Sequence, residues 1–277
     1  MKRILLFFVI LFVFLPALFA ENSELEGAAF NPWGSKEVFA LNPMTDGVLL
    51  TAGIGLSGAD LILDNVLEVN RQKYDGKIYD KDDVNAFDRK FMHSYSKKRD
   101  EAADLLLVAT MATPAALAFT DKDEWLTCGV MYAETLLIAN GVKELTKLAV
   151  NRTRPYMYYD AGTFPKDDVK DGDWANSFPS GHSTMAFASA TFTSYTFCKY
   201  FPDSAWRIPV VAGSYAMAGG VAVLRLSSGN HFMSDVLAGA AIGTLTGFLV
   251  PYLHTFNTNH DLNLSLLPNG FSLAVKF

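Results

Sequence analysis

Cysteine, zinc-site spacing and excess basic charge are scarce or missing in this sequence of 277 residues, and each shortage excludes a class of protein. The two cysteines, Cys128 and Cys198, lie inside apolar stretches, where we interpret them as small buried side chains, although an exported protein could also join them in a disulfide. No group of cysteines and histidines has the spacing of a zinc site. The formal net charge is -6, so no large basic surface is expected and a nucleic-acid partner is excluded.

Charged residues are also few, at 19% of the chain, whereas hydrophobic residues make up 50% and the mean hydropathy is +0.16. That hydropathy is high for a soluble enzyme and low for a pure membrane bundle, so composition alone leaves both classes open. The sequence has no internal repeat and no low-complexity linker. Its length suits one large domain.

The N-terminus has the pattern of an export signal. Two basic residues precede an unbroken apolar run at 4–14, and small residues at 17–20 precede a polar stretch. Leu18 fits a cleavage site after Ala20 poorly. Residues 1–20 are therefore expected to be either a signal peptide or a retained signal anchor.

The remaining chain is expected to be an all-α bundle of about five to six apolar helices. A polar and glycine-rich region, 21–102, contains one doubtful apolar segment at 48–63, interrupted by Asp60, and the predicted bundle spans 103–254. Its five apolar segments lack strand alternation and approach the length that crosses a bilayer: 105–119, 125–142, 185–201, 208–224 and 236–250. Pro114 should kink the first of them. We favour a membrane-embedded bundle, and the alternative is a soluble periplasmic one, since Glu134 lies inside the second segment.

The tail, 255–277, has a different pattern. Apolar and polar residues alternate at 262–267 and 271–277, and Pro268, Asn269 and Gly270 separate the two stretches. This pattern predicts a small β-hairpin that caps the helical domain.

Lys147 and Arg154 form the first group of residues that could carry chemistry. They are seven positions apart, which on a helix is nearly two turns, so both cations would point the same way and could bind an anion. The alternative is a basic helix end that interacts with the helix dipole or with lipid headgroups.

Ser180, Gly181 and His182 form the second group, just before the segment 185–201. A Ser-Gly turn that opens a helix offers free backbone N–H groups to a phosphate, and a histidine beside it can give or take a proton. The alternative is an ordinary serine-capped helix with a surface histidine.

Arg225, His231 and Asp235 form the third group. His231 and Asp235 are four positions apart, which makes them neighbours on a helix face. A carboxylate bonded to one ring nitrogen would leave the other nitrogen free to attack, and the Arg225 guanidinium fits phosphate oxygens. The alternative is an incidental His–Asp pair.

Together, the three groups resemble the type 2 phosphatidic acid phosphatases (PAP2), a superfamily that also holds bacterial class A acid phosphatases and vanadium haloperoxidases. The family pattern is Lys, six residues, Arg-Pro; then Pro-Ser-Gly-His; then Ser-Arg, five residues, His, three residues, Asp. The resemblance covers roughly residues 85–254, and the sequence departs from the pattern at Leu224, where the family usually has serine. The matching positions are Lys147, Arg154, Pro155, Pro179, Ser180, Gly181, His182, Arg225, His231 and Asp235.

The resemblance implies a phosphatase in which His231 forms a phosphohistidine, Asp235 orients it and His182 acts as acid and then as base. The phosphate would be held by Lys147, Arg154, Arg225, Ser180 and the amides of Gly181 and His182. No metal and no cofactor are expected, because three cations would take the place of magnesium. Arg152 lies outside the pattern and is either a further positive charge or a plain surface residue. The other histidines, His93, His254 and His260, show no partner pattern and are interpreted as structural or surface residues.

The expected substrate is a phosphorylated lipid, since an apolar bundle with a phosphate site at its end suits a lipid phosphate monoester or diphosphate. We expect a bacterial-type envelope protein in the membrane, with its site facing the periplasm and no obligate protein partner. If the segment 48–63 also spans, the site would face the cytoplasm. The remaining alternatives are a soluble periplasmic non-specific acid phosphatase, a vanadate-dependent haloperoxidase and a non-enzymatic envelope protein.

Overall fold

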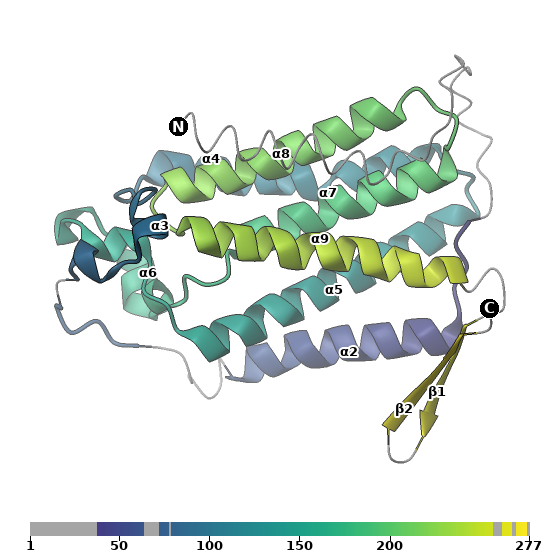
Figure 1. Cartoon of the computed structure of the whole chain (residues 1–277), viewed down its shortest axis with the longest axis horizontal. Helices are drawn as coiled ribbons and strands as arrows, with labels where there is room; N and C mark the ends of the chain where they lie inside the picture. The colour runs from purple at the N-terminus through teal and green to yellow at the C-terminus, as the bar shows by residue number, and fades with distance from the viewer. Residues whose placement is uncertain (1–37, 64–71, 78, 257–261, 268–269, 276–277) are drawn as a thin grey trace.

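A computed structural model describes residues 38–63, 72–77, 79–256, 262–267 and 270–275. The predicted signal segment, 1–20, lies outside the described residues, as does His260. The structure is mainly helical, as predicted, and its longer helices run side by side as a bundle (Figure 1). Their bounds are α2 Pro43–Leu61, α4 Lys97–Met111, α5 Glu124–Val150, α7 Gly181–Tyr200, α8 Arg207–Ser227 and α9 Met233–Phe256. The short helices are η2 Lys81–Asp83, α3 Ala86–Arg89, η3 Thr113–Phe119, η4 Pro155–Tyr158, η5 Ala161–Thr163, α6 Lys166–Asp171 and η6 Asp173–Ala175.

Helix α7 is the centre of the bundle and contacts α4, α5, α8 and α9. It is almost wholly buried although it is rich in serine and threonine. Their hydroxyls donate to the helix's own carbonyls, as in the bonds from Thr184 to Ser180, from Ser189 to Met185 and from Thr193 to Ser189. These bonds satisfy polar groups that would otherwise cost free energy when buried.

Glycines let α9 lie directly against α7. A Cβ added at Gly239, Gly243 or Gly247 would come within 2.2–2.4 Å of a backbone carbonyl oxygen of α7 or its cap. The three glycines are four residues apart and therefore form one stripe along α9. Such small-residue stripes permit close backbone approach between helices.

Substitution of Gly243 by alanine is expected to destabilise the protein by about 1–3 kcal/mol, because the new methyl group would overlap the carbonyl oxygen of Thr184 at 2.2 Å. Gly213 on α8 is the matched control, since a Cβ there meets nothing within 4 Å. Gly213→Ala should leave stability unchanged or raise it by up to about 1 kcal/mol through helix propensity. Thermal unfolding of both variants in detergent measures the contrast, and equal melting temperatures would show that the α7–α9 contact is loose.

Helix α2 belongs to the bundle although it lies in the region 21–102, which we predicted to be polar and separate. It packs along α5, where a Cβ at Gly53 would meet the Leu137 side chain and one at Gly141 would meet the Leu56 side chain. Helix α4 likewise begins at Lys97, before the predicted start of the bundle at 103. The glycines and Asp60 made the segment 48–63 doubtful in the sequence, which alone does not show that Gly53 faces another helix.

The predicted kink at Pro114 is a break, because α4 ends at Met111 and η3 follows it. In the tail, β1 (Leu262–Leu267) and β2 (Gly270–Val275) pair antiparallel, with Leu262 opposite Val275 and Leu267 opposite Gly270.

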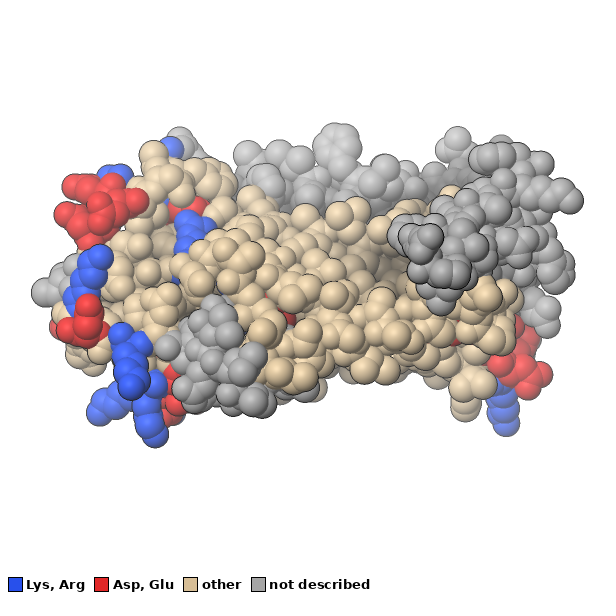
Figure 2. All heavy atoms as spheres, turned by 90° about the horizontal axis from the view of Figure 1, so that it is seen from below, with Lys and Arg blue, Asp and Glu red and all other residues tan. Residues whose placement is uncertain are grey.

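Three stretches of helix are long and apolar enough to cross a membrane by length and composition: Lys97–Phe119, Arg207–Ser227 and Met233–Thr255. These contain three of the five segments for which we predicted crossing. Figure 2 shows one face of the molecule, on which charged side chains gather near the two ends of the bundle and the surface between them is mostly uncharged. Large apolar side chains are exposed on these helices, including Leu105, Ile208 and Leu245. Exposed apolar side chains on a mostly uncharged surface are consistent with contact with lipid or with another protein.

Candidate active site

The predicted site residues lie at one end of the bundle, where α5 and α8 end and α7 and α9 begin (Figure 1). The backbone N–H of Ser180 donates to the carbonyl of Asp235 at 3.0 Å and so joins the starts of α7 and α9. The start of α4 also reaches this end, and its Asp100 contacts both Arg225 and Asn230. Segments far apart in sequence therefore meet here.

His231 lies just before α9 and is 2% exposed. Its Nδ1 is 2.7 Å from the carbonyl oxygen of Ser177. A carbonyl only accepts hydrogen bonds, so Nδ1 carries the proton and Nε2 carries the lone pair in the neutral ring. Burial, then the positive charges of Arg225 and Arg154, hold the pKa of His231 well below its ordinary value. The imidazole is therefore neutral near pH 7 and has a defined nucleophilic nitrogen.

Asp235 does not orient His231 in the way that its spacing suggested. Its Oδ2 is 3.8 Å from Nδ1, which is too long for a hydrogen bond. The i,i+4 argument was wrong because α9 begins at Met233, so His231 precedes the helix. Asp235 instead accepts from the Ser177 hydroxyl at 2.5 Å and from the Phe232 amide at 2.7 Å. It thus fixes both the segment that carries His231 and the residue that bonds to the ring.

Arg152, which the sequence left as a plain surface residue or a further charge, connects this arrangement. It donates to the carboxylates of Asp235 and Asp88, and its guanidinium lies 4.1 Å from the centre of the Phe232 ring. Asp88, which is 1% exposed, also accepts from the amide and hydroxyl of Ser234. Sequence reasoning missed Asp88 because it lies 64 positions before Arg152 and follows no motif.

Lys147 and Arg154 do not share a helix face, contrary to our prediction. Helix α5 ends at Val150, and Asn151 adopts a left-handed backbone with φ of 44°. Lys147 is on the last turn, whereas Arg154 follows in an extended conformation. A spacing of seven residues fits two helical turns, but an αL residue at the C-cap ends the helix before the second cation.

Carboxylates hold both arginines of the site. Arg154, 5% exposed, donates to Asp173 and to the Asn230 side-chain oxygen at 3.1 Å. Arg225, also 5% exposed, donates to Asp100 through one terminal nitrogen, and its Nε is buried without a hydrogen-bond partner among the described residues. A buried guanidinium N–H without an acceptor is rare in proteins and suits an anion.

Ser180 caps α7, as the sequence predicted for a Ser-Gly turn that opens a helix. Its hydroxyl oxygen accepts from the Ser183 amide at 3.4 Å and from the Ser183 hydroxyl at 3.1 Å. Gly181 is the first helical residue, and a Cβ there would come 3.3 Å from the Lys143 side chain. The helix N-terminus thus keeps its amides together with a neighbouring lysine, which favours an anion.

His182 lies on the first turn of α7, and its Nε2 is 2.6 Å from Asp104 Oδ1 of α4. Burial, then the positive charge of Arg225, lowers the pKa of His182. The charges of Arg154 and Lys147 act on the same ring, and His182 in turn acts on His231. Two imidazoles and three cations therefore lie close enough to influence one another. The alternatives from the sequence, an ordinary capped helix and an incidental His–Asp pair, do not account for this clustering.

Comparison with known proteins identifies the pattern. Residues 129–259 match the family model described as the PAP2 superfamily. The chain is 30% identical to a lipid A 1-phosphatase of Porphyromonas gingivalis over 157 residues, which is 56% of this chain and 31% of that protein. It is 29% identical to a lipid A 1-phosphatase of Rhizobium etli over 148 residues, which is 53% of this chain and 58% of that protein. The chain thus spans less than two thirds of each relative.

One solved structure also matches, the transmembrane PAP2-type phosphatidylglycerolphosphate phosphatase from Bacillus subtilis. The identity is 20% and the TM-score 0.42, and the match covers 76% of this chain and 95% of the other.

Proposed function

We propose that the chain, whose residues 129–259 match the PAP2 superfamily model, is a phosphatase that hydrolyses a lipid phosphate ester through a phosphohistidine on His231. The observation that carries the proposal is the bond between His231 Nδ1 and the Ser177 carbonyl, 2.7 Å long. This bond leaves Nε2 as a lone-pair donor beside buried guanidinium groups. A neutral, fixed imidazole among cations is suited to attack an anionic phosphate.

In the first step, His231 Nε2 attacks phosphorus and the bond between phosphorus and the leaving alcohol oxygen breaks. His182 donates a proton to that oxygen. Its lowered pKa makes it neutral in the free protein, so the two negative charges of a bound phosphate must raise the pKa of His182 enough for the ring to take up a proton from solvent before it donates one. In the second step, His182 removes a proton from water, the water oxygen attacks phosphorus and the P–N bond breaks to release phosphate.

Arginine and lysine would neutralise the phosphate charge in this reaction. The unpartnered Nε of Arg225 and the amides at the start of α7 are the donors that the described part of the chain offers to phosphate oxygens. Arg154 and Arg225 would exchange their carboxylate partners Asp173 and Asp100 for these oxygens. Phosphoryl transfer needs mainly positioning and charge neutralisation, so this reaction can proceed without a metal.

The position of the site at one end of the bundle supports a lipid substrate. The mostly uncharged surface between the charged ends suits a bilayer, and the site at one end would then be level with lipid headgroups. Two relatives are lipid A 1-phosphatases, and a phosphatidylglycerophosphatase B of Bacillus subtilis is 40% identical over 78 residues, 27% of this chain and 37% of that protein. Lipid A, phosphatidylglycerophosphate and phosphatidic acid are the candidate substrates. That the site faces the periplasm stays a prediction from the sequence.

Phosphate release by the full chain in detergent micelles should distinguish the candidates. We expect release from at least one of the three lipid phosphates, faster than from a soluble aryl phosphate, and unchanged when EDTA is present during the assay. Hydrolysis of the aryl phosphate alone would favour a non-specific acid phosphatase. Activity that EDTA abolishes and magnesium restores would contradict the metal-free mechanism.

A further inference from the structure

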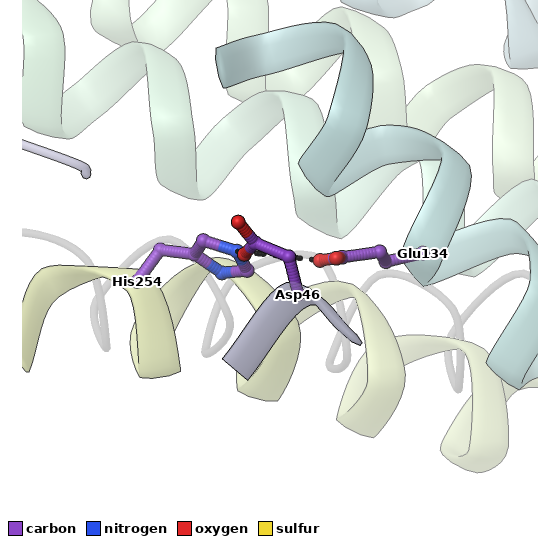
Figure 3. Close-up of side chains that lie close together, drawn as sticks. All are labelled: Asp46, Glu134 and His254. Carbon is purple, nitrogen blue, oxygen red and sulfur yellow. Dashed lines mark hydrogen bonds and ion pairs between the residues drawn. The ribbon is translucent and has the colours of Figure 1, made fainter. Parts of the chain in front are cut away.

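A second polar cluster lies at the opposite end of the bundle from His231. Asp46 of α2, Glu134 of α5 and His254 of α9 converge there from three helices (Figure 3). One potential ligand atom from each residue lies within 4.8 Å of the other two. Met233 and His254 are the first and nearly the last residues of α9, so at 1.5 Å per residue about 30 Å separates this cluster from the start of the helix. The cluster therefore takes no part in the chemistry at His231.

His254 presents a lone pair to two carboxylates. Its Nδ1 is 2.8 Å from the carbonyl oxygen of Val250, so Nδ1–H is the donor. In the neutral ring, Nε2 then has no proton, yet it lies 2.9 Å from Asp46 Oδ1 and 3.3 Å from Glu134 Oε2. Three electron-rich atoms that face one another repel unless a cation or a proton lies among them.

Glu134 is the second indication of a ligand. Its side chain is 0% exposed, and neither carboxylate oxygen has a hydrogen-bond partner within the described ranges. Figure 3 shows this carboxylate aimed at His254 and Asp46. A buried carboxylate without donors is strongly unfavourable unless a cation or a proton compensates it.

We propose that Asp46, Glu134 and His254 bind a divalent metal ion that joins α2, α5 and α9. Two carboxylates and one neutral imidazole balance the charge of a divalent ion, so the buried site becomes neutral. Metal-binding histidines commonly donate their other ring N–H to a backbone carbonyl, as His254 does to Val250. Asp46 is 14% exposed and gives the ion access from solvent.

The ligand set favours zinc or another transition metal over magnesium or calcium. Imidazole suits zinc, iron, copper and nickel, whereas magnesium and calcium prefer oxygen ligands alone. Tetrahedral zinc with bonds near 2.0–2.1 Å places its ligand atoms about 3.3–3.5 Å apart. The 2.9 and 3.3 Å separations around His254 Nε2 need only a slight expansion to match. Three protein ligands leave the fourth position to water.

The test is zinc binding by the full-length protein in detergent. After treatment with EDTA and removal of the chelator, the protein is titrated with Zn²⁺, and bound metal is measured by mass spectrometry alongside thermal unfolding. We expect one tightly bound zinc per chain and a rise in melting temperature on zinc addition. No bound zinc, or no rise in the wild-type protein, would overturn the proposal.

Glu134→Gln and His254→Gln should weaken zinc binding by about 100-fold or more, since even residues that only support a ligand change affinity 10–100-fold. Without metal, Glu134→Gln should be at least as stable as the metal-free wild type, because it removes an uncompensated buried carboxylate. Loss of stability in metal-free Glu134→Gln would show an ordinary ion pair with His254 and contradict a metal site. Glu124→Gln is the control: Glu124 is a buried carboxylate on the same helix that accepts from Tyr200, and its replacement should leave zinc affinity unchanged.

The metal site and the phosphatase chemistry can fail separately. Zinc binding is read from metal content and melting temperature, neither of which depends on turnover. Phosphate release that is insensitive to EDTA, measured well below the melting temperature of the metal-free protein, would support the proposed function whether or not zinc binds.

Discussion

Replacement of His231 by alanine is expected to reduce phosphate release to background, a loss on the order of 10⁶-fold, which is the size seen when a covalent nucleophile is removed. The remaining cations and amides can still bind phosphate. Among the described residues at this site, however, only His231 is a buried histidine with one ring nitrogen bonded to a carbonyl and the other left with its lone pair. The measurement is the steady-state rate with the best lipid substrate. Rapid quenching with radiolabelled substrate should detect an acid-labile phosphoramidate in the wild type and none in the variant.

His231→Asn provides the matched control for folding. Its side-chain amide can donate to the Ser177 carbonyl as Nδ1–H does, but it has no counterpart of Nε2. We therefore expect a melting temperature close to that of the wild type together with the same loss of activity. Turnover at the wild-type rate by either variant would refute His231 as the nucleophile.

Replacement of His182 by alanine should lower kcat by about 10²–10⁴-fold, the usual contribution of an acid–base group. The phosphohistidine forms through His231, so the variant should still become labelled and should lose its label slowly. Substrates with acidic leaving groups need less protonation, and with them the labelled form should accumulate. Single-turnover experiments with an alkyl and an aryl phosphate measure this difference.

Asp104→Asn is the companion variant, because Asp104 contacts His182 at 2.6 Å and is otherwise 61% exposed. Loss of this positioning residue should reduce kcat less than loss of His182 and should shift the pH profile of kcat. If His182→Ala kept kcat within about 10-fold of the wild type, some other group would have to supply the acid.

The sequence predicted which residues meet, because phosphate chemistry restricts the residue types and the helix ends restrict their places. It predicted less well how they meet. The spacing predicted that Arg154 shares a helix with Lys147 and that Asp235 bonds to the His231 ring. Instead, the left-handed Asn151 ends the helix before Arg154, and α9 begins only after His231. Backbone conformation at a single residue is decided by tertiary contacts, which a periodic pattern does not contain.

Residues that meet only through the fold were the ones missed. Asp88 reaches Arg152 from a different part of the chain, and His254 finds its carboxylates on α2 and α5. Neither relation has a characteristic spacing. The only sequence signals were a carboxylate within an apolar segment, Glu134, and a histidine at the end of another, His254.

The contact between α7 and α9 limits how far the residues at their ends can move relative to each other. Gly239 and Gly243 have no side chains, and at these positions α9 lies directly against the backbone of α7 and its cap. Sliding of one helix along the other would therefore bring backbone atoms into collision. His182 lies on the first turn of α7, and His231 lies two residues before the start of α9. In the proposed mechanism, the His231 nitrogen and the His182 ring would thus keep a nearly constant separation through both steps. Adjustment to a bulky substrate is then expected from α4, since the stretch Lys97–Phe119 that contains it is mostly unburied and its Asp100 and Asp104 contact Arg225 and His182.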